Sequence, residues 1–180
     1  MSPEEFLNLG FSKELVVLFI AALPVLELRG ALPVAINVLG LPWYYALFWA
    51  LLGNLLPVPL LLISLKAITE WLSRIDFFRR PLNWLFERTR QRGRIVDRYK
   101  RIGLALFVAI PLPATGAWTG SLVAVLFNLK FKHAFLAILA GVLMAGIIVT
   151  CLSLLGWAGA FIAGVVLISL AVTGLWRFPE

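Results

Sequence analysis

Long stretches of this chain contain no aspartate, glutamate, lysine or arginine, and they constrain the fold more than any other feature. Residues 102–129 form one such stretch and residues 133–176 another. A helix of about 20 apolar residues crosses the roughly 30 Å hydrocarbon core of a bilayer. Soluble domains carry charge on about a quarter of their residues, whereas this chain has 14% charged residues. The sequence therefore predicts an all-α integral membrane protein.

Positive charge is concentrated in residues 71–101, where ten lysines and arginines stand against Asp76, Glu87 and Asp97. Apolar residues recur in this segment at spacings of three and four, which predicts an amphipathic helical segment at the membrane interface, divided in two at Pro81. Anionic lipid headgroups are its expected partners. Basic loops between membrane helices are retained on the cytoplasmic side. We therefore expect this segment and the C-terminus to be cytoplasmic and the N-terminus to lie outside, and nucleic acid is not an expected partner.

The apolar sequence divides into complete and interrupted membrane segments. Residues 42–70, 131–156 and 157–176 are continuous enough to form transmembrane helices. Residues 14–41 and 102–129 contain prolines and glycines near their centres. Proline lacks a backbone donor and obstructs the preceding turn, so each interrupted segment is predicted to form two half-helices. Unwound backbone at that depth requires a covering of protein or a watered cavity.

Both interrupted segments are predicted to return to the side from which they enter, as re-entrant hairpins. If residues 102–129 crossed the membrane completely, Lys130 and Lys132 would lie outside, against the positive-inside tendency. Each hairpin and the long helix after it form one repeat, so the repeats cover 14–70 and 102–156 of a single membrane domain, 1–180. A shift of 88 residues relates them, and they enter from opposite sides. Inverted repeats with broken helices are typical of secondary transporters.

The first interruption contains the pair Glu27 and Arg29 beside Gly30 and Pro33. An ionisable group at the centre of a membrane helix costs roughly 3 kcal/mol and usually serves a function there. Burial and the charge of Arg29 act in opposite directions on the pKa of Glu27, which suits a proton carrier. Arg29 offers a planar donor fork for an anion, and free N–H groups of a half-helix beginning near Gly30 could receive one. A purely structural ion pair is the alternative.

The second interruption supplies polar and small residues opposite that pair. The shift of 88 residues aligns Thr115 with Glu27, and glycines allow close approach of the backbone. Trp118 adds an indole donor. The candidate site residues of this segment are Pro111, Pro113, Thr115, Gly116, Trp118 and Thr119. Asn54, which precedes two prolines in the long apolar helix, is interpreted as a residue satisfying a kink rather than as a ligand contact.

Signals for catalysis are absent from the sequence. It contains one histidine and one cysteine, no cluster with metal-ligand spacing, no phosphate-binding loop and no nucleophile motif. We therefore predict neither an enzyme nor a bound cofactor or metal.

The first interruption reads Leu23-Pro24-Val25-Leu26-Glu27-Leu28-Arg29-Gly30-Ala31-Leu32-Pro33. The second reads Ile110-Pro111-Leu112-Pro113-Ala114-Thr115-Gly116-Ala117-Trp118-Thr119-Gly120. Both resemble the corresponding segments of the small multidrug export family. That family is distantly similar to the DedA superfamily of SNARE-associated, VTT-like membrane proteins. The resemblance implies a prokaryotic cytoplasmic-membrane protein. DedA relatives imply translocation of anionic lipids such as a polyprenyl phosphate, coupled to a proton or ion gradient. Their second hairpin typically carries an arginine, which residues 111–121 lack.

Three functions are compatible with these features. The first is a small secondary transporter or flippase for an anionic lipid or amphipathic solute, with Glu27 as its proton-coupling group. The second is a proton-coupled exporter of small cationic drugs, which the charge of Arg29 disfavours. The third is a membrane scaffold or assembly factor that transports nothing. Assembly into a homo-oligomer is left open by the sequence.

Overall fold

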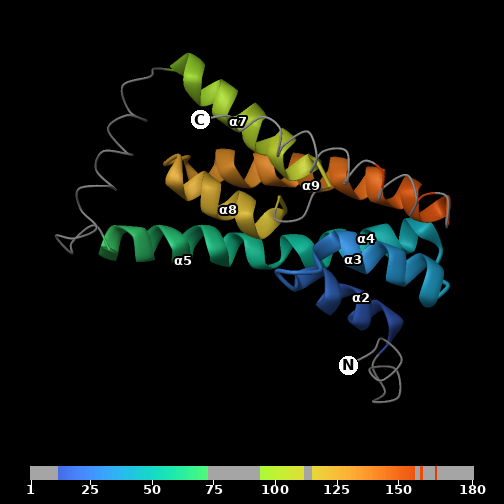
Figure 1. Cartoon of the computed structure of the whole chain (residues 1–180). Helices are drawn as coiled ribbons and strands as arrows, with labels where there is room; N and C mark the ends of the chain where they lie inside the picture. Colours follow the sequence, from blue (N-terminus) through green and yellow to red (C-terminus); the bar gives the residue numbers. More distant parts are fainter. Residues whose placement is uncertain (1–11, 73–93, 112–114, 157–158, 160–164, 166–180) are drawn as a thin grey trace.

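The computed structural model describes residues 12–72, 94–111 and 115–156, together with residues 159 and 165 (Figure 1). All regular structure within these ranges is helical. The elements are α2 (Lys13–Ala22), α3 (Glu27–Pro33), the π-helix η1 (Val34–Val38), α4 (Trp43–Leu55), α5 (Pro57–Leu72), α7 (Arg94–Ala109), α8 (Ala117–Leu126) and α9 (Phe131–Leu154). The predicted transmembrane helix 157–176 lies outside the described residues except at two positions, as does most of the basic segment 71–101.

The first interrupted segment folds into a helical hairpin. Helix α2 begins after Ser12, whose side chain accepts a hydrogen bond from the backbone N–H of Leu15. It ends at Ala22. The next residue, Leu23, is extended, because the residue before a proline, here Pro24, is disfavoured in the helical region. Helix α3 begins at Glu27 and packs back against α2.

A π-helix follows the proline at the end of α3. Pro33 has no N–H, so the carbonyl of Arg29 cannot receive the usual bond from four residues ahead. The chain widens into η1, where the N–H of Leu39 reaches the carbonyl of Val34, 2.9 Å away. Single π-turns of this kind are frequent at functional sites.

The second interrupted segment also forms a helical hairpin, from α7 and α8. Helix α7 begins at Arg94 rather than at residue 102, so the end of the basic segment is continuous with the first arm of the hairpin. The break follows Ala109, because Pro111 disfavours helical backbone at the residue before it. Gly116, in extended conformation, then precedes α8.

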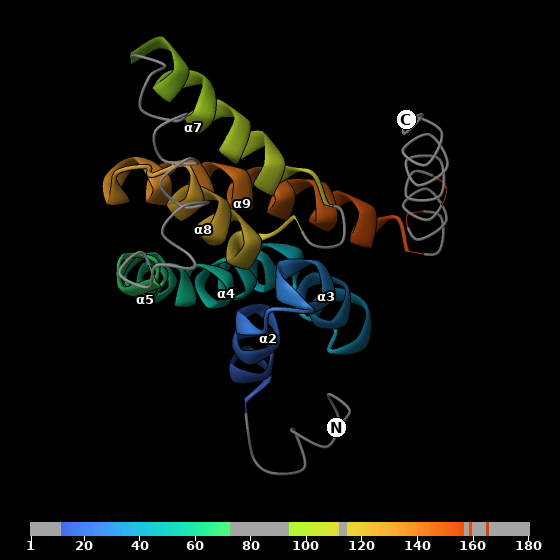
Figure 2. The same ribbon diagram turned by 60° about the vertical axis from the view of Figure 1, so that its left-hand side comes forward.

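Two long antiparallel helices form the middle of the molecule (Figures 1 and 2). The first consists of α4 and α5, which are separated by a single turn residue, Leu56. Helix α5 begins at Pro57. The second long helix is α9. Residues Trp43–Thr69 and Phe131–Leu154 are long and apolar enough to cross a membrane. The predicted helices 42–70 and 131–156 are therefore confirmed as long apolar helices.

The two hairpins enter the bundle from opposite ends, and their broken tips meet near its middle (Figures 1 and 2). Helix α2 packs on α4, and α7 packs on α9. Helix α3 also packs on α9, and α8 packs on α5. Each hairpin therefore contacts the long helix of its own half and the long helix of the other half.

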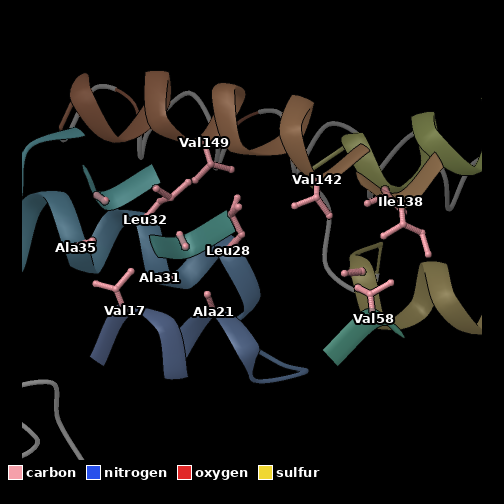
Figure 3. Packing of buried hydrophobic residues seen from close by; sticks show 14 of the residues in the cluster. Val17, Ala21, Leu28, Ala31, Leu32, Ala35, Val58, Ile138, Val142 and Val149 are labelled. Atoms are coloured by element: carbon pink, nitrogen blue, oxygen red, sulfur yellow. The ribbon is translucent and has the colours of Figure 1, made fainter. Parts of the chain in front are cut away.

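The core consists of small and branched apolar side chains, and many large apolar side chains point outward. Figure 3 shows Val17, Ala21, Ala31 and Val149 packed at the junction of α2, α3 and α9. Small residues allow the close helix approach that is typical of membrane bundles. Large apolar side chains that are exposed include Phe19, Val25, Phe48, Leu60, Ile63 and Ile147. An apolar exterior of this extent is suited to lipid rather than to water.

Candidate functional site

Glu27 and Arg29 lie in the first turn of α3, at the tip of the first hairpin. The Glu27 side chain is 6% exposed, and its backbone has a positive φ of 48°. Non-glycine residues in that conformation are uncommon and often mark functional or strained sites. The tip is thus built around a buried carboxyl group rather than around a flexible loop.

The half-helix after the first break begins at Glu27 and not near Gly30, which corrects the expected geometry. The turn before it is already helical, because the Glu27 N–H reaches the Leu23 carbonyl at 3.0 Å. The N–H of Gly30 donates to the carbonyl of Leu26 at 2.9 Å. That N–H group is therefore not free to receive an anion, as the sequence interpretation had allowed.

Arg29 reaches across to the second hairpin and binds the end of α7. Its Nη2 lies 2.9 Å from the carbonyl oxygen of Thr115, 3.0 Å from the Thr115 hydroxyl and 3.3 Å from the carbonyl oxygen of Ile110. The Thr115 hydroxyl itself donates to the Ile110 carbonyl at 2.7 Å. Carbonyls at a helix C-terminus lack partners within the helix and favour a cation. The arginine supplies both the hydrogen bonds and the charge.

Glu27 lies at the opposite kind of helix end, the N-terminus of α8. Its Oε1 is 3.5 Å from the backbone nitrogen of Trp118. Gly116, which precedes α8, has no side chain to cap the helix, and a Cβ atom there would overlap the Glu27 carboxyl group. A carboxylate is stabilised at a helix N-terminus by the free N–H groups and the helix dipole. Glutamate and arginine thus complement the two broken ends of the second hairpin.

A third link joins the hairpins in the reverse direction. The indole Nε1 of Trp118 donates to the carbonyl of Ala22, the last residue of α2, at 3.2 Å. The C-terminal end of each hairpin's first arm therefore receives a donor from the other hairpin. These links tie the two breaks together at the centre of the bundle.

The remaining sequence-predicted residues lie less directly in this contact. The Thr119 hydroxyl donates to the carbonyl of Gly116 within its own helix, at 3.2 Å. Gly30 and Pro33 on α3, and Pro111 beyond α7, are half-buried, and Pro113 lies outside the described residues. The structure brings together Glu27, Arg29, Thr115, Gly116 and Trp118.

A small cavity of about 10 Å³ lies beside the two charged residues. It is lined by Glu27, Leu28, Arg29, Asn54, Val108, Gly116, Ala117, Val142 and Ala145. Space of this size is about what a single water requires. As the hairpins are packed here, the cavity has no room for a larger molecule.

Asn54 is the residue of this site that sequence reasoning undervalued. It is 3% exposed, lines the cavity, and its Oδ1 has no hydrogen-bond partner among the described residues. The sequence interpretation treated Asn54 as satisfying a kink, whereas its side-chain amide oxygen has no partner in the described part of the chain. The signal that could have identified it is its polarity in the middle of a span that is otherwise apolar.

The described residues contain no group of three or more histidine, cysteine, aspartate or glutamate side chains placed to hold a metal ion. The chemistry available at the hairpin contact is therefore that of one carboxyl group, one guanidinium group, and hydroxyl, indole and amide side chains.

The helical fold, the two apolar spans and the apolar exterior define an integral membrane protein. The chain belongs to the family described as "Putative small multi-drug export protein", which it matches over residues 27–148. The match begins at Glu27, covers the second hairpin break and the α4–α5 helix, and ends within α9. The family's description names export and not a class of enzymes. Neither a curated protein nor a solved structure was found to match the chain.

Proposed function

We propose that this protein is a small secondary transporter built as an inverted repeat of two re-entrant hairpins, each followed by a long helix. The entry of the hairpins from opposite ends supports the inversion (Figure 1). Matching close contacts support the repeat, because a Cβ at Gly53 would overlap the Leu18 carbonyl on α2, and one at Gly141 would overlap the Ala105 carbonyl on α7. The two glycines are 88 residues apart, as the sequence alignment of the halves requires.

The carbonyls that accept hydrogen bonds between the hairpins are related by the same shift of 88 residues. Ala22 and Ile110 are also 88 residues apart, and the carbonyl of each accepts a hydrogen bond from the opposite hairpin. Each hairpin thus helps to hold the other closed at the midplane. Transporters with this architecture alternate access by moving one repeat against the other around a central site. In this proposal, the contact between the hairpin tips is the gate.

Glu27 is the coupling group of this proposed gate. As a carboxylate, it carries the negative charge that the N-terminus of α8 favours. Protonation removes that charge and weakens the hydrogen bond from the Trp118 N–H, because charge-assisted bonds are roughly twice as strong as neutral ones. Arg29 then loses a neighbouring counter-charge with which it interacts electrostatically. Proton binding would therefore loosen one hairpin from the other.

The transported substrate in this proposal is an anionic lipid, such as a polyprenyl phosphate, or another anionic amphipath. A cavity of about 430 Å³ opens between the end of α5 and the end of α8. It is lined by Leu62, Ile63, Lys66, Ala67, Val125, Asn128, Leu129 and Phe131. Ligand sites are commonly of this volume and largely apolar, with a few polar groups that orient the ligand. One lysine and one asparagine among apolar side chains suit a molecule with an apolar body and an anionic end.

The second candidate is a proton-coupled exporter of small cations, which the family's description favours. Glu27 would then attract the cation as well as the proton. The guanidinium of Arg29 disfavours this function, because it lines the same small cavity and would repel a cation. A non-transporting scaffold is the third candidate, and a transport assay separates it from the first two.

The observation that carries the proposal is the contact of buried Glu27 and half-buried Arg29 with the opposite hairpin. To test it, purified protein is reconstituted in liposomes with an imposed pH gradient. One preparation contains a fluorescent short-chain phosphatidic acid, and another contains the cationic dye ethidium. We expect the gradient to drive movement of the lipid, and Glu27→Gln to abolish that dependence. Glu14→Gln, which alters a glutamate at the start of α2, is the matched control and should transport as the wild type does.

Each outcome decides between candidates. Gradient-driven movement of ethidium and not of the lipid would replace the first function with the second. Movement of neither would favour a scaffold. Full gradient dependence in Glu27→Gln protein would remove Glu27 from the mechanism even if transport itself is observed.

A further inference from the structure

Asn54 presents a buried hydrogen-bond acceptor that the fold leaves without a donor. Its Oδ1 is one of three buried side-chain atoms without a partner in the described part of the chain, with Trp49 Nε1 and Thr150 Oγ1. Neither Trp49 nor Thr150 lines the cavity beside Glu27, whereas Asn54 does. Leaving a buried acceptor unpaired is costly, and such atoms in native proteins call for a specific explanation.

The cavity places this acceptor in the same small space as a second one. An ionised carboxyl group only accepts hydrogen bonds, and so does the amide oxygen of asparagine. Two acceptors that share a cavity need a donor between them. Two donors fit a cavity of this size and charge, namely a single water molecule and the acidic proton of neutral Glu27. A metal cation is disfavoured, because Arg29 also lines the cavity.

We propose that Asn54 is the acceptor for the protonated form of Glu27, reached through one water held in the cavity. This proposal rests on the proposed function, in which Glu27 exchanges the coupling proton. As a carboxylate, Glu27 accepts a bond from the second hairpin at Trp118. When protonated, it donates instead through the water to Asn54 on α4. On protonation, the hydrogen-bond partner of Glu27 therefore changes from Trp118 on the opposite hairpin to Asn54 in its own repeat.

The asymmetry of the two halves agrees with this role. The residue 88 positions after Asn54 is Val142, which lines the same cavity from α9. Valine offers neither donor nor acceptor, so the cavity has its side-chain amide on one side only. Glu27 likewise aligns with Thr115, which does not ionise. Both the proton carrier and its proposed acceptor therefore belong to the first repeat.

Other titratable groups on the packed helices lie away from this cavity. Of the described residues that line it, Arg29 is the one ionisable side chain besides Glu27, and α8 contains no titratable side chain. The titratable residues on the helices packed against α3 are Lys13 and Glu14 on α2, Tyr44 and Tyr45 on α4, and Lys132, His133 and Cys151 on α9. None of these lines the cavity. A change at Asn54 thus acts on the protonation of Glu27 directly.

Infrared titration of the protein in lipid membranes tests the proposal without a transport substrate. Protonated Glu27 gives a carboxylic-acid C=O band that is identified by its loss in Glu27→Gln. In Asn54→Val, which introduces the residue of the equivalent position, we expect this band to move to higher wavenumber, as for an acid with a weaker hydrogen bond. The pH at which the band is half-developed should fall by about 0.5 to 1 unit, corresponding to the loss of one hydrogen bond.

Two further variants complete the experiment. Asn54→Ser keeps an acceptor oxygen, so its band should lie close to the wild-type position. This variant keeps the proposal testable if the valine variant misfolds. Thr150→Val removes another buried unpartnered oxygen, away from the cavity, and should leave the band unchanged. An unaltered band in Asn54→Val overturns the proposal. So does the absence of any Glu27-dependent band between about pH 4 and pH 9. Loss of gradient dependence in Glu27→Gln with an unaltered band in Asn54→Val would overturn this inference alone.

Discussion

Arg29 on the first hairpin and Thr115 on the second are joined through one guanidinium nitrogen. Nη2 of the arginine lies 2.9 Å from the carbonyl oxygen and 3.0 Å from the hydroxyl oxygen of the threonine. The threonine hydroxyl also donates to the carbonyl of Ile110. One hydroxyl group therefore links the arginine to the end of α7, and its contribution can be measured without changing any charge.

Thr115→Val should lower the stability of the closed arrangement. The substitution keeps the shape and removes the hydroxyl, which costs roughly 1.5–3 kcal/mol when the partner is charged. Thr119→Val is the matched control, because the Thr119 hydroxyl bonds the carbonyl of Gly116 at the start of its own helix. Melting temperatures in one detergent should fall clearly for the first variant and little for the second. Equal falls would mean that the link to Arg29 adds nothing.

Gly116→Ala should displace the Glu27 carboxyl group from the N-terminus of α8. A Cβ atom at this position overlaps that carboxyl group, and overpacking of this kind typically costs about 1–3 kcal/mol. Gly103→Ala is the control, since nothing lies within 4 Å of a Cβ at that helical position. That control should be neutral or stabilising by up to about 1 kcal/mol. Thermal unfolding and gradient-driven transport should both be impaired in Gly116→Ala alone.

The paired glycines of the long helices provide a test of the repeat. Gly53→Ala forces α4 away from α2, and Gly141→Ala forces α9 away from α7. Because the two contacts are equivalent in an inverted repeat, we expect losses of similar size, in the range of about 1–3 kcal/mol each. Their measured effects on the melting temperature should be comparable. A large loss in one and none in the other would contradict equivalent packing.

A double-mutant cycle separates a structural role of the charged pair from a functional one. If the pair is purely structural, Glu27→Gln and Arg29→Gln each leave the partner's charge uncompensated. The cost for a fully buried pair is roughly 3–5 kcal/mol, and the double variant recovers stability. If Glu27 is the coupling group, its single variant remains folded and loses gradient dependence. Unfolding measured beside transport for all three variants distinguishes the two patterns.

Membrane topology can be tested with single cysteines in a Cys151→Ala background. Pro42→Cys, beyond the first hairpin, should react with a membrane-impermeant reagent from outside intact cells. Lys100→Cys and Lys130→Cys, at the two ends of the second hairpin, should react only after permeabilisation. External reaction at Lys130→Cys with protection at Lys100→Cys would mean that residues 102–129 cross the membrane and are not re-entrant. The same result would remove the inverted repeat.

The breaks and the long helices were predictable because their causes are local. Pro24 and Pro111 interrupt helices through their own covalent geometry. The lack of charge from His133 to Leu154 requires a helix in lipid. Helix starts were less predictable. The second arm of the first hairpin begins at Glu27 rather than near Gly30. The reason is that the N–H groups of Glu27 and Gly30 already donate to the carbonyls of Leu23 and Leu26 in the preceding turn. No periodicity in the sequence reports such a turn.

By itself, the sequence determined a helical membrane protein with two interrupted segments, and it identified Glu27 and Arg29 as residues too costly to place in lipid without a reason. The tertiary structure decided what those charges contact. Glu27 lies against the N-terminus of α8 and Arg29 against the C-terminal end of α7, 81 to 91 residues away along the chain. It also placed Asn54 in their cavity. Composition and spacing act over a few turns of helix, whereas partners this distant are set by how the two hairpins pack together.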